Sequence, residues 1–228
     1  MGVCMDKTTM AIETYNHIID EYIKYLKEVN LDGGVPLQRE TDYLISILPS
    51  KSKILDVGTA MGYYPKYLTE KSDKNFEVTG IDASDKMIEQ AKKTALNADF
   101  KVMDIRDMKY PSKSFDCIMC FGTLIHLNDD DCLKILNDFD RILCDNGILA
   151  INVMEHLSGD REIVVDEPFN NNYKMYYNRY PKDFFINYLK ENNYTIIKTF
   201  DNPIYNEESV GDDLTGTNEF SIIARKNN

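Results

Sequence analysis

Tryptophan is absent from this chain of 228 residues, and so are long hydrophobic runs. The longest clear apolar run, Ile148 to Met154, contains Asn152 and is far too short to span a bilayer. The first ten residues hold no apolar stretch of the length that a secretory signal requires. We therefore expect a cytoplasmic protein without a membrane partner, whose aromatic surface comes from 15 Tyr and 10 Phe.

Positive charge is scarce in this sequence. The chain carries 26 Lys and Arg against 38 Asp and Glu, a formal net charge of −12, and it has no local stripe of basic residues. Such a field repels a phosphate backbone, so nucleic acid and anionic membranes are not expected as partners. The balance favours a neutral or cationic small molecule. Nothing in the sequence indicates an oligomeric state.

Cysteine occurs five times, an odd number that does not suggest a framework of disulfides. Cys117 and Cys120 have the spacing of a zinc or redox motif, but they lie inside the run Phe115 to Phe121, which is typical of a buried strand. In a strand, an offset of three places the two sulfurs on opposite faces of the sheet. We therefore expect reduced, buried thiols.

The hydrophobic periodicity predicts an α/β protein with helices on both faces of a mostly parallel sheet. Helical spacing over residues 8–30 and 37–48 is followed by repeated strand–helix–strand units. Strands are predicted at 53–57, 77–81, 100–103, 115–121, 148–154, 194–200 and 219–224, and the later helices at 62–71, 84–97, 129–143 and 182–191. Because no helix separates the last two strands, the final strand is expected to be antiparallel.

The same pattern suggests two parts, an N-terminal helical cap over residues 1–50 and a sheet domain over residues 51–228. The break at Gly33 and Gly34 is a hinge that would let residues 8–48 close as a lid. Two long connections should meet the same mouth. One is an inserted, tyrosine-rich segment at about 154–180, and the other is the acidic stretch 202–218.

The loop after the first strand has the glycine spacing of a ligand site. Gly58 permits a tight turn, and Gly62 opens the next helix, whose free N–H groups face the mouth. A dinucleotide site would need glycine two and five residues after Gly58, where the chain has Ala60 and Tyr63. The residues fit instead the pattern D-x-G-x-G-x-G, beginning at Asp56, with alanine in place of the middle glycine.

Two aspartates follow the next two strands at the same edge of the sheet. Asp82 ends the second strand, where a carboxylate can accept both hydroxyls of a ribose. The alternative is that Asp82 or Ser84 only caps the next helix, and Ser84 is the better cap. Asp104 ends the third strand and can accept a hydrogen bond from an adenine amine, although Asp99 and Asp107 compete for this interpretation.

Residues 54–153 resemble the class I S-adenosylmethionine-dependent methyltransferases, in the branch that acts on small molecules. Four segments carry the resemblance: ILDVGTAMG, GIDASDKMIEQAKK, the strand ending at Asp104 with SFDCIMCFGTLIHL, and LNDFDRILCDNGILAINV. The resemblance implies a Rossmann-like sheet of seven strands with an antiparallel last strand, a helical N-terminal extension and S-adenosylmethionine as cofactor. It implies a cofactor site made of Asp56, Gly58, Ala60, Gly62, Asp82, Ala83, Met87, Asp104, Ile105 and Phe121.

Within that site, the backbone around Gly58 would approach the methionine moiety and Asp82 would hold the ribose. Asp104 and Ile105 would flank the adenine, and Phe121 would pack near the cofactor. The departure from the family pattern is Ala60, whose small methyl group predicts a tighter fit. Relatives with degraded glycine loops include proteins that no longer catalyse, so a cofactor-binding or regulatory protein without turnover is the alternative to an enzyme.

His126 is the best-placed candidate for a general base, if the acceptor must lose a proton. The alternative is that His126 packs or caps at the helix start that follows it. Some metal-dependent relatives carry acids at the positions of Gly122 and Ile125, so no metal site is expected here. A tyrosine group in the inserted segment would line a substrate pocket, an interface or ordinary strand packing; it comprises Tyr173, Tyr176, Tyr177 and Tyr180.

Overall fold

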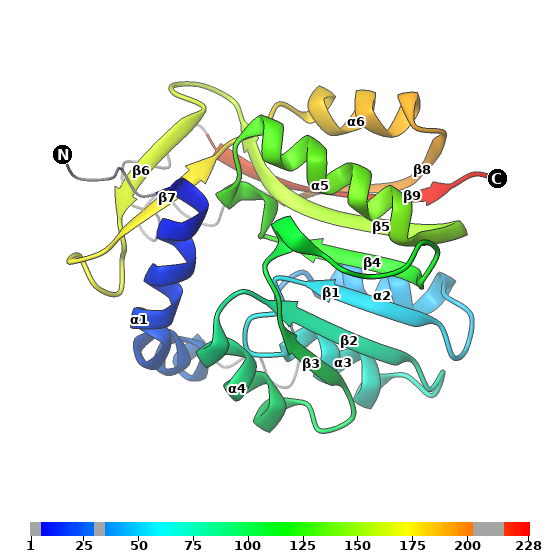
Figure 1. The fold of residues 1–228 in the computed structure, drawn as a ribbon, viewed down its shortest axis with the longest axis horizontal. Helices are drawn as coiled ribbons and strands as arrows, with labels where there is room; N and C mark the ends of the chain where they lie inside the picture. Colours follow the sequence, from blue (N-terminus) through cyan, green and yellow to red (C-terminus); the bar gives the residue numbers. More distant parts are fainter. Residues whose placement is uncertain (1–5, 30–34, 203–216) are drawn as a thin grey trace.

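A computed structural model describes residues 6–29, 35–202 and 217–228 of the chain. Its main feature is a seven-stranded sheet of order β3-β2-β1-β4-β5-β9-β8 (Figure 1). The strands are β1 (Lys53–Val57), β2 (Glu77–Asp82), β3 (Asp99–Val102), β4 (Phe115–Phe121), β5 (Leu143–His156), β8 (Tyr194–Asn202) and β9 (Thr217–Lys226).

The strand directions confirm the sequence prediction. β1 lies centrally and pairs in parallel with β2 and β4, and β4 pairs in parallel with β5. β9 runs antiparallel to both β5 and β8, so β8 points the same way as the first five strands. The main difference is the length of β5, which extends to His156 because β9 pairs with it from Ile148 to that residue.

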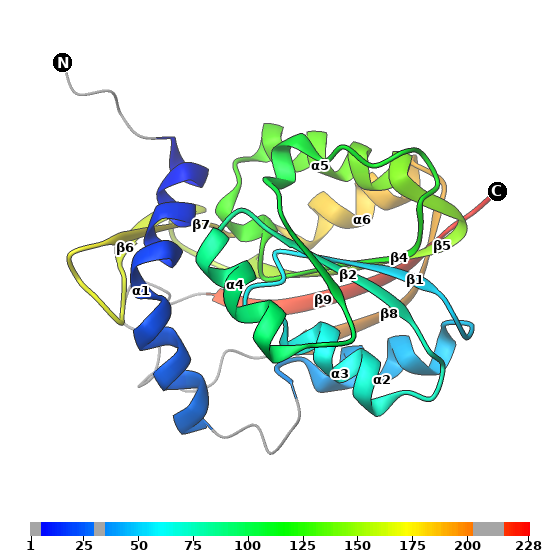
Figure 2. The same cartoon turned by 60° about the horizontal axis from the view of Figure 1, so that its bottom comes forward.

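Helices cover both faces of the sheet. α2 (Gln38–Ile47) and α3 (Tyr63–Lys71) lie on one face, where Leu44 and Leu68 pack with Ile54. α5 (Asp129–Ile142) and α6 (Lys182–Glu191) lie on the opposite face (Figure 2). Cys117 packs in the core beneath α2 and α3, and Cys120 packs in the core beneath α5 and α6, which confirms that the two sulfurs are on opposite faces. α4 (Asp85–Thr94) packs against β3 at the sheet edge.

The remaining elements gather at the carboxyl end of the parallel strands. α1 (Lys7–Val29) packs against α4 and against a hairpin of β6 (Glu162–Asp166) and β7 (Lys174–Asn178), as Figures 1 and 2 show. The hairpin lies within the tyrosine-rich segment 154–180. The Thr14 hydroxyl donates to the Lys174 carbonyl at 2.9 Å and fastens helix to hairpin. α2 packs into the core on its own face of the sheet, so of the first two helices only α1 extends over the carboxyl end of the strands.

Short 3-10 turns follow β3 and β4: η1 (Ile105–Asp107) and η2 (Leu124–His126). Among the described residues, no helix is both long and apolar enough to cross a membrane. The proposed hinge at Gly33 and Gly34 lies outside the described residues. So do Glu207, Glu208, Asp212 and Asp213 of the acidic connection.

Candidate cofactor and acceptor site

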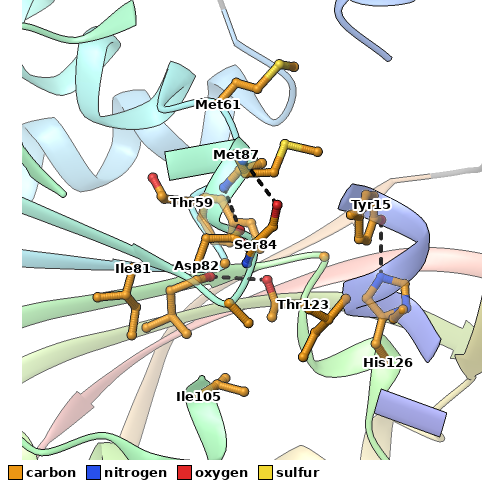
Figure 3. A pocket seen from close by; sticks show the side chains of 18 of the residues that line it. Tyr15, Thr59, Met61, Ile81, Asp82, Ser84, Met87, Ile105, Thr123 and His126 are labelled. Carbon is orange, nitrogen blue, oxygen red and sulfur yellow. Dashed lines mark hydrogen bonds between the residues drawn. The ribbon is translucent and has the colours of Figure 1, made fainter. Parts of the chain in front are cut away.

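A cavity of about 380 Å³ opens where the parallel strands end. Its walls come from the loops after β1, β2, β3 and β4, the start of α4, and the inner face of α1 (Figure 3). All but two of the residues predicted for the site line this one cavity. They are Gly58, Ala60, Asp82, Ala83, Met87, Asp104, Ile105, Phe121 and His126. Their contact with a cofactor stays a prediction.

The glycine loop is held by its own backbone. The amides of Gly58 and Thr59 both donate to the Ile81 carbonyl at 2.9 Å, which fastens the loop to β2. Gly58 has φ 71°, and a Cβ there would stand 1.9 Å from the Thr123 hydroxyl, so no side chain fits. Ala60 also has a left-handed φ, 45°. The alanine therefore keeps the backbone shape of a glycine loop, at a strain that glycine would not carry.

Asp56 and Gly62 are the two predicted residues that do not line the cavity. Asp56 is buried beneath the loop, where the Thr59 hydroxyl donates to its carboxylate at 2.6 Å. Burial raises the pKa of Asp56 to about 7, the Thr59 hydrogen bond opposes that shift, and the charge of Asp82 adds to it. Gly62 begins α3 against Phe100. Both residues shape the loop from below.

Asp82 faces the cavity, and its carboxylate is already bound by backbone amides even though Ser84 caps α4. Ser84 is the cap, as expected, with its hydroxyl accepting from the Met87 amide at 3.1 Å. The Asp82 carboxylate nevertheless accepts from the amides of Ala60 and Ser84, each at 2.9 Å. Burial raises the pKa of Asp82 and these backbone donors lower it. The backbone amides orient the carboxylate at the cavity wall.

Asp104 has a structural role that its position alone did not reveal. Its carboxylate caps η1 by accepting from the Arg106 amide at 2.8 Å, and it forms an ion pair with the Arg106 guanidinium at 2.7 Å. Burial raises the pKa of Asp104, but the hydrogen bonds and charge of Arg106 outweigh it, so the pKa lies below its usual value. Arg106 also pairs with Asp6, which joins the start of α1 to this wall.

His126 is buried at the junction of η2, β7 and α1. Its Nδ1 lies 2.9 Å from the Tyr176 carbonyl, so Nδ1 carries the proton and donates. Its Nε2 then has a free lone pair, which accepts from the Tyr15 hydroxyl at 3.3 Å (Figure 3). Burial lowers the pKa of His126 to about 4, against the Tyr176 hydrogen bond that raises it. The ring is therefore neutral at pH 7.

The tyrosines of the inserted segment support the site from behind. None of the four is among the described residues that line this cavity, so they form no part of its wall. Tyr180 is fully buried, and its hydroxyl donates to the carbonyls of Leu124 and Leu127 at 3.1 and 2.7 Å. Tyr176 holds His126 through its backbone carbonyl. These tyrosines fix η2, and hence the imidazole, in place.

Several cavity residues were missed by the sequence analysis. Tyr15 and Tyr22 are spaced along the apolar face of the first helix, a pattern that indicates packing. Asn152 interrupts the apolar run of β5, and this polar residue in a buried strand was a signal. Glu219 begins the last strand beside an acidic connection and resembles a solvated residue. Only the fold brings α1, β5 and β9 to one cavity.

Comparison with known proteins agrees with this geometry. Residues 54–147 match the model of the "Methyltransferase domain" family. Demethylmenaquinone methyltransferase of Thermotoga maritima is 31% identical over 115 residues, which cover 50% of this chain and 48% of that protein. Phosphoethanolamine N-methyltransferase 1 of Arabidopsis thaliana is 34% identical over 105 residues, 44% of this chain and 21% of that protein. The chain thus matches half or less of these relatives' lengths.

Among solved structures, a protein from Methanosarcina mazei described as an S-adenosylmethionine-dependent methyltransferase has the same fold. It superposes with a TM-score of 0.68 at 17% identity, over 81% of this chain and 97% of that one. The sheet order and the loop geometry agree with the family match. Residues 54–147 of this chain therefore match the methyltransferase domain family, and they lie in a chain that has the fold of a solved structure described as an S-adenosylmethionine-dependent methyltransferase.

Proposed function

We propose that this protein transfers a methyl group from S-adenosylmethionine to a small-molecule acceptor in the cytoplasm. One observation carries the proposal: a single cavity is lined both by the glycine loop with Asp82 and by the Tyr15–His126 pair. The names of the matched curated relatives describe methyltransferases that act on small molecules. Free, buried thiols at Cys117, Cys120 and Cys132 support a reducing compartment.

The cavity residues fit the cofactor. The volume of the cavity lies in the range of small-molecule sites. Asp82 offers a carboxylate for ribose hydroxyls, Met103 and Ile105 offer apolar surface for adenine, and a Cβ on Gly122 would meet nothing within 4 Å, so space is open above that backbone. When bound, S-adenosylmethionine supplies an electrophilic methyl group. The protein's own task is then to align the acceptor, exclude water and move a proton.

Tyr15 and His126 are placed for the proton step. The Tyr15 hydroxyl lines the cavity and can accept a proton from an acceptor group as its own proton passes to Nε2 of His126. Nδ1 keeps its proton, held by the Tyr176 carbonyl. A buried imidazole with a lowered pKa is a weak base, so this pair suits a nucleophile that loses its proton as methyl transfer proceeds.

The charges favour a neutral or cationic acceptor. Among the described residues, the cavity wall carries the carboxylates of Asp82, Asp104 and Glu219 and no Lys or Arg. A phosphorylated acceptor needs cationic or amide donors at its phosphate. Because this wall offers no such cation, we propose that the acceptor differs from the phosphoethanolamine named for one relative.

Parallel binding and turnover assays test the proposal. Calorimetry with S-adenosylhomocysteine and with NAD should show binding of the first alone. Labelled S-adenosylmethionine should then transfer its methyl group to a component of a metabolite extract. Cofactor binding without any labelled product would favour a regulatory, non-catalytic protein, and NAD binding would contradict the family-based assignment of the cofactor.

A further inference from the structure

One corner of the cavity is built from parts of the fold that the cofactor residues do not use. Glu219, the third residue of β9, and Asn152, on β5, both line the cavity there. The register pairs Asn152 with Ser221, two residues beyond Glu219, so the three side chains share one face of the sheet. The Asn152 amide donates to the Ser221 hydroxyl at 3.1 Å, which fixes its orientation beside Glu219.

A second carboxylate stands behind this corner. Glu40 of α2 is fully buried, and one of its oxygens accepts from Asn202 at 2.8 Å and from Ser221 at 3.3 Å. Its other oxygen, Oε2, is buried and has no hydrogen-bond partner among the residues that the structure describes. The exposed guanidinium of Arg39 lies 3.7 Å from Oε1 and does not line the cavity.

The corner is therefore short of positive charge. Burial raises the pKa of Glu219, a hydrogen bond from Asn152 lowers it, and the charge of Glu40 raises it further. The other cavity carboxylates differ, because Asp82 is held by backbone amides and Asp104 is paired with Arg106. Two desolvated carboxylates without a cation on the cavity side make a site for a positive charge that the described chain does not itself supply.

Aromatic rings complete the corner. Tyr64, Phe121 and Tyr22 line the same cavity, and the rings of Tyr64 and Phe121 meet edge to face with centroids 5.3 Å apart. Glu219, Glu40 and Tyr22 all lie close enough to raise the pKa of Tyr64, after the larger effects of burial and Asp56. Ring faces attract ammonium groups, and a carboxylate beside them adds a charge-assisted hydrogen bond.

We infer that Glu219 and Asn152, with Tyr22 and Tyr64, form an anchoring subsite for an ammonium group on the acceptor. The inference rests on the proposed function, because it takes this cavity as the acceptor site. An ammonium held by Glu219 is not the nucleophile, since its nitrogen lone pair is engaged in an N–H bond. The acceptor therefore carries a second group that receives the methyl and faces Tyr15 and His126.

Matched amine and alcohol probes test the subsite by binding alone. Ethanolamine and ethylene glycol form one pair, and tyramine and 4-(2-hydroxyethyl)phenol form another. Each is titrated into the protein with and without S-adenosylhomocysteine. At least one amine should bind about tenfold or more tightly than its alcohol. Glu219→Gln should abolish that preference, Glu219→Asp should keep part of it, and Glu77→Gln, at the opposite end of β2, should leave it unchanged.

The outcomes separate the two proposals. An amine preference that survives Glu219→Gln, no amine preference in the unaltered protein, or tighter binding of phosphoethanolamine than of ethanolamine would overturn the subsite. An amine preference that depends on Glu219, found in a protein that transfers no methyl group, would overturn the proposed function and leave the subsite standing. Retained affinity of Glu219→Gln for S-adenosylhomocysteine shows that the variant is folded.

Discussion

The hydroxyl of Tyr15 lies 3.3 Å from Nε2 of His126, and this contact joins α1 to the turn after β4. The two rings meet edge to face, with centroids 5.6 Å apart. The Thr8 hydroxyl adds a second link by donating to the His126 carbonyl at 3.1 Å. The candidate proton-transfer pair thus forms only when the N-terminal helix is seated on the cavity.

Removing the Tyr15 hydroxyl should slow methyl transfer without weakening the binding of the cofactor. We expect Tyr15→Phe to lower kcat by about 100-fold, the low end of the range for a positioned acid–base group. Affinity for S-adenosylhomocysteine should stay within about twofold of that of the unaltered protein, a smaller change than the loss of a hydrogen bond to the cofactor would cause. Tyr67→Phe, which removes a hydroxyl bound to Asp42 away from the cavity, is the control. Equal rates in both variants would exclude Tyr15 from the proton step.

Asp82 is expected to carry the cofactor's ribose. Because the two carboxylate oxygens accept from the amides of Ala60 and Ser84, alanine would release both amides and asparagine only one, so Asp82→Asn is the smaller change. Calorimetry should show weaker S-adenosylhomocysteine binding by about 1.5–3 kcal/mol, the value of hydrogen bonds to a charged group. Asp85→Asn, exposed in the first turn of α4, should bind normally. Unchanged affinity of Asp82→Asn would remove the ribose assignment.

Ala60 tests whether the loop stores strain. Its φ of 45° costs an L-residue about 1–2 kcal/mol, whereas glycine adopts it freely. The greater freedom of glycine in the unfolded chain opposes this gain by about 0.4–1 kcal/mol. The net effect of Ala60→Gly should be a stabilisation of about 0.5–1 kcal/mol in urea unfolding. Ala95→Gly, at a φ of −127°, should destabilise. A loss of stability in both would mean that the loop relaxes around the alanine.

The sequence predicted the sheet and the cofactor side of the site because both depend on local signals. Alternating periods determine the strands, and the residues at the strand ends, such as Gly58 and Asp82, meet at one edge in any parallel sheet. The acceptor side has no such signal. Tyr15 reaches His126 across 111 residues, and Glu219 and Asn152 meet through antiparallel pairing whose register no short motif encodes. Long-range packing determines those contacts.

α1 is expected to act as a lid over the cavity. It contributes Thr8, Ala11, Ile12, Tyr15 and Tyr22 to the wall. A bound cofactor would be enclosed by this face, so hydrogen exchange across α1 should slow when S-adenosylhomocysteine is added. α6, which packs against β8 and contributes no residue to the cavity wall, should exchange at the same rate in both states. Ligand-independent exchange in α1 would make the helix a fixed part of the scaffold.

Two buried groups should give stability opposite dependences on pH. Asp56 has a folded pKa of about 7, above its ordinary 3.8, so between these values the native state binds more protons and the free energy of unfolding falls as pH rises. His126 has a folded pKa of about 4, below its ordinary 6.5, so between these values the unfolded state binds more protons and stability rises with pH.

Urea unfolding from pH 4.5 to 7.5 separates the two contributions. The stability of Asp56→Asn relative to the unaltered protein should increase with pH up to about 7 and then level, since the variant lacks the cost of ionising a buried carboxyl. The relative stability of His126→Gln should decrease with pH up to about 6.5. Each slope is at most about 1.4 kcal/mol per pH unit, the limit for one proton. Lost packing shifts either curve by a constant and leaves its slope unchanged, so two curves of the same sign would contradict the assigned burial of these groups.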